Sequence, residues 1–595
     1  MQVGEHRDAL VARVKVLSRV AGVLLAAICG SFWFVQVVRG TYYRDLADNN
    51  RLRKIAIKAP RGTIYDRNGR ALVENIPSYN LLLDRSQSKS VPGALAFAAG
   101  ALGKPAAALA AVAARYADVP AFAPVLLAED LTLPQVARFE VARLEHPEFS
   151  VEVSHRRLYR LGTYAAHALG YLGEVSVEEL EEPDTPYGAG DLVGRHGLER
   201  IYDRRLRGSD GERVVVVDSR GQPVEESARE VGKAGGSLHL TLDASLQEEA
   251  ERALEGKVGA VVALDPRNGE IRALVSAPAF DPNLFTRRLA VEEWRQLISD
   301  SHHPLQNRAL QSTYSPGSVF KIVVATAALA EGVVDTAKGV FCNGTAMYYG
   351  RPFHCWKQGG HGWMSLETAI KNSCDVYFYK LGQGLGIERL ARWARRFDLG
   401  RSTGIDLDGE KSGLVPDADW SQRIRRHAWY PGETISVAIG QGALLVTPLQ
   451  VATMIAAVAN GGYRVTPHLV ADAVVPPPES LGLDAQALEP VRRGLWRVVN
   501  DQGTGASARV VGVEIAGKTG TVQVASHAAF ADTSDAPWEL RNHAWFASYA
   551  PAAHPELVIV VFIEHGGQGS RVAAPVAKQI YEKYFVADHG GTPAS

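Results

Sequence analysis

Residues 315–332 read SPGSVFKIVVATAALAEG, a turn followed by an apolar run that has the length of a buried helix. On a helix, residues three apart share one face, so Ser318 and Lys321 are predicted to lie side by side. A serine hydroxyl is a poor nucleophile until a neighbouring base takes its proton, and a partly buried lysine near another positive charge can be that base. Backbone N–H groups at the start of the helix can hold an oxyanion. The segment therefore predicts a serine nucleophile with a lysine as its base.

A second motif, NSCD at residues 372–375, opens an aromatic-rich segment that we expect to be helical. The Ser373 hydroxyl is suited to relay a proton to a leaving amine, and Asp375 is suited to orient its surroundings. Both residues also suit an ordinary helix start, where a hydroxyl caps the backbone and an acid is favoured by the helix dipole. On its own, this motif does not distinguish catalysis from capping.

A third motif, GKTGT at residues 517–521, follows an apolar segment and is predicted to lie on a strand. Gly520 has no side chain, which would let a substrate backbone approach the strand closely. Lys518, Thr519 and Thr521 are then suited to bind a carboxylate. Thr-Gly-Thr alone most often marks a turn. The three motifs together, in this order and with spacings of about 50 and about 145 residues, predict one serine–lysine site.

Helices and strands are mixed around these motifs. Residues 258–278 predict a hairpin of two β-rich runs, and residues 245–256 before it predict a helix. Nearer the N-terminus, residues 61–72 (RGTIYDRNGRAL) predict another hairpin, and the Ala-rich residues 91–118 predict a helical insertion. We therefore expect an α+β chain, with a domain boundary in the Gly-rich residues 232–236.

Residues 20–38 form an uncharged run of 19 residues, VAGVLLAAICGSFWFVQVV, which is long enough to cross a bilayer as a helix. Basic residues precede it, so the positive-inside rule predicts that residues 1–19 lie in the cytoplasm and the rest of the chain outside it. A cleaved signal peptide would need a shorter run and a small-residue cleavage site, and a lipid-anchored start would need a small residue before Cys29. An uncharged core helix of this length is rare in soluble proteins. We expect a single-pass transmembrane helix at residues 20–39.

The overall composition excludes two classes of protein. The 595 residues include 64 lysines and arginines against 65 aspartates and glutamates, for a formal net charge of −1. This balance gives no electrostatic case for binding nucleic acid. Four cysteines in so long a chain exclude a disulfide-scaffold protein. The length suggests about three or four domains.

Three of the four cysteines, Cys342, Cys355 and Cys374, fall within 33 residues, and His361 lies between the last two. The pattern C-x12-C-x5-H-x12-C offers the Cys3His ligand set of a structural zinc site, in which Cys374 would brace the second motif. The gaps are long for a zinc finger, and a Cys342–Cys355 disulfide or three free thiols are the alternatives. His354, next to Cys355, is a second candidate nitrogen ligand.

The three motifs, with YRDLADNNRLR, APRGTIYDRNGRAL, GRHGLERIYD and ISVAIGQGALLVTPLQ, resemble the class B penicillin-binding proteins, most closely those of cell elongation. The resemblance covers nearly the whole chain. It implies a β-rich pedestal domain of the dimerisation type with a helical insertion at residues 40–235. It also implies a transpeptidase domain at 236–585, an antiparallel sheet flanked by helices as in the serine β-lactamases, and a flexible tail at 586–595. Asp375 stands where many relatives carry asparagine.

The resemblance also implies an activity and the roles of residues. As a D,D-transpeptidase, the enzyme would use Ser318 to attack the penultimate D-Ala of a stem peptide, expel the terminal D-Ala and pass the acyl group to a neighbouring stem. Hydrolysis of the same acyl-enzyme would be a carboxypeptidase reaction. By motif, Lys321 is the base, Ser373 the relay, and Lys518 with the two threonines holds the carboxylate. The backbone N–H groups of Ser318 and Thr521 would form the oxyanion hole, and catalysis would need no cofactor.

The partners implied by the resemblance are peptidoglycan stem peptides, β-lactams, the membrane, a RodA-type glycosyltransferase and MreC-like elongation proteins, with no nucleic acid. The expected location is the bacterial inner membrane, with the catalytic domain in the periplasm. A β-lactamase or β-lactam sensor of the same chemistry is one alternative, and an inactive wall-synthesis scaffold is another. The strand-rich residues 40–235 do not suit a helical glycan polymerase domain.

Overall fold

The structure is a computed structural model and describes residues 2–43, 52–121, 123–183, 185–188, 190–217, 223–287, 289–524 and 536–587. Two compact units share the chain. The first comprises Met1–Pro60, Pro77–His155 and Gly208–Gly235, and the second Arg61–Ile76, Arg156–Arg207 and Gly236–Ser595. The segment predicted as a pedestal thus contributes to both units. Most of the predicted tail, from residue 588 on, lies outside the described residues.

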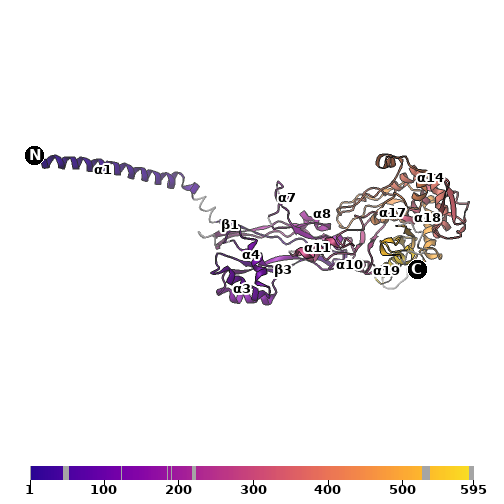
Figure 1. Cartoon of the computed structure of the whole chain (residues 1–595), viewed down its shortest axis with the longest axis horizontal. Helices are drawn as coiled ribbons and strands as arrows, with labels where there is room; N and C mark the ends of the chain where they lie inside the picture. Colours follow the sequence, from indigo (N-terminus) through magenta and orange to yellow (C-terminus); the bar gives the residue numbers. More distant parts are fainter. Residues whose placement is uncertain are drawn as a thin grey trace. The chain divides into compact units, whose positions relative to one another are not determined.

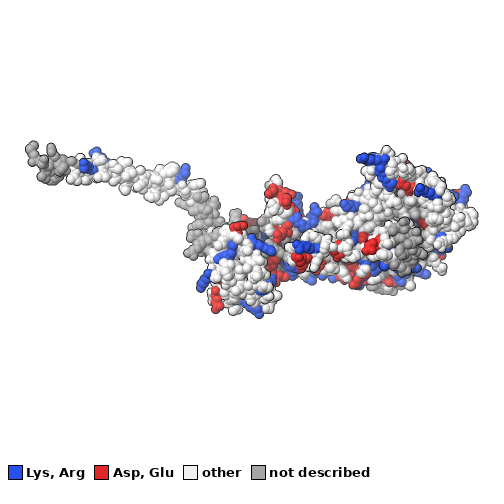
Figure 2. Space-filling view, in the orientation of Figure 1, with Lys and Arg blue, Asp and Glu red and all other residues white. Residues whose placement is uncertain are grey.

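The first unit begins with α1 (Gln2–Trp33), a long helix followed directly by the π-helix η1 (Phe34–Val38) (Figure 1). Within Leu10–Val38, an 18-residue window has a mean hydropathy of 2.0, and none of that window is buried. Figure 2 shows an uncharged stretch of this segment with basic side chains on either side of it. Within the described part of the chain it is the one helix long and apolar enough to cross a membrane, which agrees with the predicted anchor.

The rest of the first unit combines a sheet with a helical lobe. Strands β1 (Leu52–Ile57), β8 (Gly211–Val217) and β9 (Pro223–Glu230) form an antiparallel sheet in the order β1-β8-β9. The predicted Ala-rich insertion is confirmed, and the lobe consists of α3 (Val91–Leu102), α4 (Ala106–Ala114), β4 (Val125–Ala128) and α5 (Leu133–Val141). Ser90 caps α3 by accepting the N–H of Gly93, and Gly103 ends the helix with a left-handed φ of 67°.

In the second unit, the hairpin predicted at residues 61–72 is confirmed. Strand β2 (Ile64–Tyr65) pairs with the start of β3 (Ala71–Leu83), and β10 (Leu238–His239) pairs with β2 in parallel. Strand β5 (Phe149–Tyr159) enters this unit at Arg156, and short elements follow it along the chain: α6 (Ala166–Leu169), β6 (Leu172–Glu174), α7 (Val177–Leu180), β7 (Leu192–Gly194), α8 (Gly197–Ile201) and α9 (Asp203–Arg207). The buried carboxylate of Glu199 links these elements, because it accepts hydrogen bonds from Arg157 and Arg61, both at 2.8 Å.

The core of the second unit is a five-stranded antiparallel sheet in the order β12-β11-β21-β20-β19. Its strands are β11 (Gly259–Leu264), β12 (Ile271–Ala277), β19 (Ala516–Val522), β20 (His543–Ala550) and β21 (Leu557–Ile563). Side chains alternate between the two faces of a strand, and every residue of β11 and β21 is buried, so both faces of the sheet are covered. Two pairs of helices cover them, α10 (Ala244–Ala253) with α19 (Gly569–Glu582), and α17 (Pro448–Ala459) with α18 (Ala485–Asn500).

The segments that carry the motifs pack beside this sheet in the second unit. They and their neighbours are α11 (Val291–Ser299), the 3₁₀ helix η4 (Gly317–Phe320), α12 (Lys321–Ala330), β13 (Val340–Cys342), β14 (Thr345–Tyr348), β15 (Arg351–His354), β16 (Gly362–Met364), α13 (Leu366–Lys371), α14 (Asp375–Arg396), α15 (Ala418–Trp420), α16 (Pro431–Val437), β17 (Tyr463–Arg464) and β18 (Glu479–Ser480). Helix η4 contacts both α12 and β19. The first and third motifs therefore meet although about 200 residues separate them in the sequence.

Candidate active site

Ser318 lies on the turn between a loop and a buried helix, as predicted. It is half-buried in η4, between the buried residues Gly317 and Val319. Gly317 has a φ of +54°, and its N–H donates to the carbonyl of Gly440 at 2.9 Å. The turn is therefore held by a loop more than 100 residues away in the sequence, which presents Ser318 at the start of α12.

Lys321 is fully buried, and its amine points at the second motif. Nζ donates to the carbonyl of Ser373 at 2.9 Å, to Ser373 Oγ at 3.2 Å and to Asp375 Oδ1 at 2.6 Å. Among the described residues, the Ser318 hydroxyl makes no hydrogen bond. We expected the amine to reach this hydroxyl. The structure instead aims the amine at a carboxylate and a carbonyl, because an ionised acceptor binds an ammonium more strongly than a hydroxyl does.

Ser373 and Asp375 lie at the start of α14, which is buried against α12. Ser373 has a left-handed φ of +54°, and Cys374 precedes the first helical residue, Asp375. The second carboxylate oxygen of Asp375 accepts the backbone N–H of Trp356 at 2.9 Å. Each oxygen of Asp375 therefore has its own donor, which holds this carboxylate in one orientation.

Lys518 lies on β19, as predicted, and is fully buried. Its amine donates to the carbonyl of Thr519 at 3.0 Å. Burial and the nearby positive charge of Lys321 hold the pKa of Lys518 well below its usual value, and the negative charge of Asp375 opposes them only in part. A negative charge placed beside Lys518 would favour its charged form, so the site suits an anionic ligand.

The two threonines of the third motif are tied to different elements. Thr519 Oγ1 donates to Thr504 Oγ1 at 2.8 Å, and Thr521 Oγ1 accepts the N–H of Gly569, at the start of α19, at 3.3 Å. These bonds fix the orientation of both hydroxyls at the edge strand of the sheet.

Two glycines set the geometry of the serine turn. A Cβ on Gly520, which is predicted to admit a substrate backbone, would lie 2.9 Å from Trp545 Cβ and 3.2 Å from the carbonyl oxygen of Pro316. This glycine therefore also lets β19 approach the serine turn. The motifs did not single out Gly440, on which a Cβ would lie 2.0 Å from the Gly317 oxygen. Its only signal in the sequence is its place in the run GQG.

Comparison with known proteins identifies the family of this site. A family model described as "Penicillin binding protein transpeptidase domain" matches residues 259–582, more than half of the chain. A second, "Penicillin-binding Protein dimerisation domain", matches residues 56–240. The chain belongs to the penicillin-binding proteins.

This penicillin-binding protein is similar to relatives over nearly its whole length. It is 34% identical to "Peptidoglycan D,D-transpeptidase MrdA" of Haemophilus influenzae over 97% of this chain and 91% of the relative. It is also similar to the solved complex between Penicillin-Binding Protein (PBP2) and MreC from Helicobacter pylori. There the TM-score is 0.81 and the identity 28%, over 90% of this chain and 98% of that chain. A chain in a structure titled "Structural coordination of polymerization and crosslinking by a peptidoglycan synthase complex" matches with TM-score 0.73 and 31% identity, over 98% of this chain and all of that chain. The family and two-domain architecture drawn from the sequence are confirmed.

The penicillin-binding protein also carries the predicted cysteine cluster beside its second motif. The ligand atoms of Cys342, Cys355, His361 and Cys374 all lie within 4.8 Å of one another. Sγ of Cys342 and Sγ of Cys355 lie 3.7 and 3.5 Å from His361 Nδ1, and all three cysteines are free and buried. A tetrahedral zinc ion would separate neighbouring ligand atoms by about 3.5–3.8 Å, which matches the two sulfur–nitrogen distances. His354 is exposed and shares a hydrogen bond with Thr345, outside the cluster.

Proposed function

We propose that this penicillin-binding protein is a peptidoglycan D,D-transpeptidase that works through an ester on Ser318. The observation that carries the proposal is the placement of Lys321, three residues after Ser318 and fully buried, with Nζ 3.2 Å from Ser373 Oγ. In its neutral form Lys321 can take the serine proton, which can then pass to the Ser373 hydroxyl and from there to the leaving amine. The relatives named peptidoglycan D,D-transpeptidase support this substrate class.

The reaction has two balanced steps. In acylation, Ser318 Oγ forms an ester with the carbonyl of the penultimate D-Ala, the amide C–N bond breaks, and the terminal D-Ala leaves as an amine that takes up the proton. In transfer, an amine of a neighbouring stem attacks the ester, a new amide forms, and the proton returns to Ser318. The backbone N–H groups of Ser318 and Thr521 stabilise the oxyanion in both steps.

The donor stem ends in a carboxylate, and Lys518 with its neighbouring threonines is placed to receive it. The burial and the Lys321 charge that lower the pKa of Lys518 disfavour its charged form in the free enzyme. A carboxylate at this position favours the charged amine again. The enzyme is therefore expected to acylate on a donor peptide with a free C-terminal carboxylate and to discriminate against the corresponding amide.

The experiment that tests the nucleophile is mass spectrometry of the full-length protein with and without penicillin. The expected result is one covalent adduct that maps to Ser318, and its loss in the Ser318→Ala variant. Ser315→Ala is the matched control, because Ser315 lies three residues earlier and its carbonyl accepts the indole N–H of Trp545 at 3.1 Å. An adduct that persists in Ser318→Ala would refute the assignment.

The products of the reaction separate the alternatives. A transpeptidase is expected to stay acylated by penicillin for a long time, whereas a β-lactamase would release the hydrolysed drug quickly. With paired stem peptides, a crosslinked dimer indicates transfer, and a shortened monomer indicates carboxypeptidase activity. A chain whose Ser318→Ala variant still supported crosslinking in cells would be a scaffold.

The proposal places the enzyme in the bacterial inner membrane with its N-terminus in the cytoplasm. Arg13, Lys15 and Arg19 precede the apolar part of α1, and the positive-inside rule assigns such a flank to the cytoplasmic side. Reporter enzymes fused after the apolar run should be active only if they function in the periplasm. Activity of a cytoplasmic reporter at the same fusion point would reverse the orientation.

A structural zinc ion held by Cys342, Cys355, Cys374 and His361 is part of the proposal. A bound ion would link two hairpins to Cys374, the residue before Asp375. The ion would take no part in the reaction. Metal analysis of the purified chain should find about one zinc per molecule, and Cys355→Ser should lose the zinc and melt at a lower temperature. Cys29→Ser, whose cysteine lies in α1, should keep the zinc. A metal-free protein with a Cys342–Cys355 disulfide would contradict the proposal.

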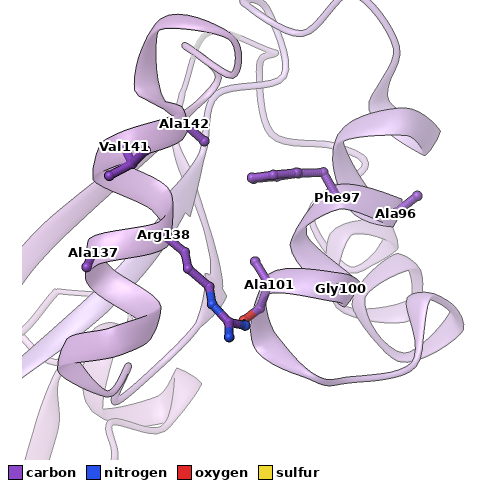
Figure 3. A pocket seen from close by; sticks show the side chains of 8 residues that line it. All are labelled: Ala96, Phe97, Gly100, Ala101, Ala137, Arg138, Val141 and Ala142. Atoms are coloured by element: carbon purple, nitrogen blue, oxygen red, sulfur yellow. The ribbon is translucent and has the colours of Figure 1, made fainter.

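An MreC-like protein and a RodA-type glycosyltransferase are the proposed partners, supported by the solved complex of a relative with MreC and by the synthase-complex structure. We assign the MreC-like partner to an apolar hollow of about 640 Å³ in the first unit, lined mainly by alanines and by Phe97 and Val141 (Figure 3). The hollow lies between α3 and α5, where Arg138 donates to the carbonyl of Ala101 at 3.2 Å. Val141 is 86% exposed, so a partner can bury it.

A binding assay with the purified MreC homologue from the same cell tests this surface. Val141→Glu should weaken binding at least tenfold, because a charge cannot enter an apolar contact without losing its hydration. Val153→Glu is the matched control, since Val153 is 63% exposed in the same unit but does not line the hollow. If both variants bind the MreC homologue equally well, the partner does not bind at this hollow.

A further inference from the structure

Trp356 joins the cysteine-rich segment to the second motif through three hydrogen bonds. Its backbone N–H donates to Asp375 Oδ2 at 2.9 Å. Its indole N–H donates to the carbonyls of Asn372 and Ser373 at 3.1 and 3.2 Å. Two of these acceptor groups also hold the lysine, because Lys321 Nζ donates to the Ser373 carbonyl at 2.9 Å and to Asp375 Oδ1 at 2.6 Å.

We propose that Trp356 is a positioning residue for the lysine base. This role rests on the proposed function and deepens it. Trp356 contributes to acylation without contacting the substrate. The tryptophan fixes the two groups that orient Lys321, namely the Ser373 carbonyl and the Asp375 carboxylate.

The backbone conformation at Ser373 explains why hydrogen bonds are needed to hold its peptide in place. Its φ of +54° lies in the left-handed region, which a residue with a side chain rarely adopts. A peptide in that conformation has a lower-energy alternative, and turning it would move the carbonyl away from Lys321. The hydrogen bond from the Trp356 indole N–H to the Ser373 carbonyl restrains this peptide, and so does the hydrogen bond from the buried Lys321 amine.

Burial accounts for little of the role of this tryptophan, whose ring lies 5.4 Å from that of His361. Its side chain is 59% exposed, so the apolar area that it removes from water is small. Trp363 in the same segment is similar, being 73% exposed with its ring 5.6 Å from that of Phe341. Within the described residues Trp363 makes no side-chain hydrogen bond. Trp363 is therefore the matched control, because it is an exposed tryptophan without these hydrogen bonds.

The test compares acylation of the full-length variants by a fluorescent penicillin, with the kinetics separated into the binding constant Ks and the acylation rate k2. Two changes remove the indole N–H and keep an aromatic ring: Trp356→Phe, and β-(3-benzothienyl)alanine at the same position, in which sulfur replaces the N–H group. Both should lower k2 about five- to tenfold and leave Ks unchanged, as expected for one lost hydrogen bond. Trp363→Phe should change neither constant more than about twofold.

The outcomes separate this inference from the proposed function. If the sulfur analogue acylates with the wild-type k2, or if only Ks changes, the indole is a packing or ligand-contact group and the inference fails. Because the sulfur analogue preserves the size of the indole, a lower k2 with an unchanged melting temperature cannot come from misfolding. If the wild-type protein itself is not acylated at Ser318, the proposed function fails first.

Discussion

Replacing Asp375 by asparagine tests the electrostatics of the site most directly. Lys321 is fully buried, and its Nζ lies 2.6 Å from Asp375 Oδ1. The other carboxylate oxygen accepts the backbone N–H of Trp356 at 2.9 Å. The amide of Asp375→Asn has one acceptor oxygen in place of two and carries no charge, so the two donors can no longer both be satisfied.

The magnitude follows from these contacts. Removing one partner of a buried ion pair costs about 3–5 kcal/mol, and a buried donor left without an acceptor costs about 1–3 kcal/mol. Asparagine keeps one of the two hydrogen bonds of Asp375. We therefore expect the free energy of unfolding of this unit to fall by about 2–4 kcal/mol. The acylation rate k2 should fall by about tenfold to a hundredfold, since each factor of ten corresponds to about 1.4 kcal/mol.

The assays are denaturant unfolding of the full-length protein and stopped-flow acylation by a fluorescent penicillin. Asp406→Asn is the matched control. Asp406 Oδ1 and Oδ2 accept the backbone N–H groups of Leu469 and Val470 at 2.7 and 3.0 Å in the same unit. The control should lose stability and keep its acylation rate. Wild-type stability together with wild-type acylation in Asp375→Asn would refute the reasoning.

Three further predictions follow from the same contacts. Gly440→Ala should lower the acylation rate about a hundredfold, because its Cβ would lie 2.0 Å from the Gly317 oxygen, whereas Gly442→Ala, with no neighbour closer than 3.8 Å, should acylate much faster than Gly440→Ala. Burial lowers the pKa of His167 from 6.5 to about 3, and its Nε2–H donates to the Pro304 carbonyl at 2.8 Å. As the pH falls, the unfolded chain therefore takes up this proton at a higher pH than the folded chain does. The free energy of unfolding has its full value above about pH 6.5 and should fall by up to about 5 kcal/mol toward pH 3. In His167→Gln, the free energy of unfolding should depend less on pH over this range. A strong chelator should lower the melting temperature and expose three more thiols per chain to a thiol reagent, and an unchanged thiol count would argue against a metal at the cysteine cluster.

Local sequence patterns predicted most of the elements. The turn before Ser318, the hairpins at 61–72 and 258–278 and the Ala-rich helices depend on residues close together in the chain. Their propensities and periodicities are therefore visible in short windows. The order and spacing of the three motifs indicated that distant segments form one site, and the structure brings them together beside the central sheet.

Contacts between distant segments were not visible in this way. The direction of the Lys321 amine depends on Ser373 and Asp375, which lie more than 50 residues away. The need for glycine at position 520 depends on Trp545 and Pro316, since those residues occupy the space of its missing side chain. A sequence pattern shows that a residue lacks a side chain, but only packing shows what fills the space.

The sequence by itself determined the family, the apolar helix and the chemical groups at the centre of the site, because these depend on residue type, order and spacing. The tertiary structure decided which acceptor the lysine faces, why two glycines are needed and where Trp356 donates its N–H groups. Hydrogen bonds and steric exclusion act over a few ångströms in space, and the residues that meet here lie up to about 200 positions apart in the chain.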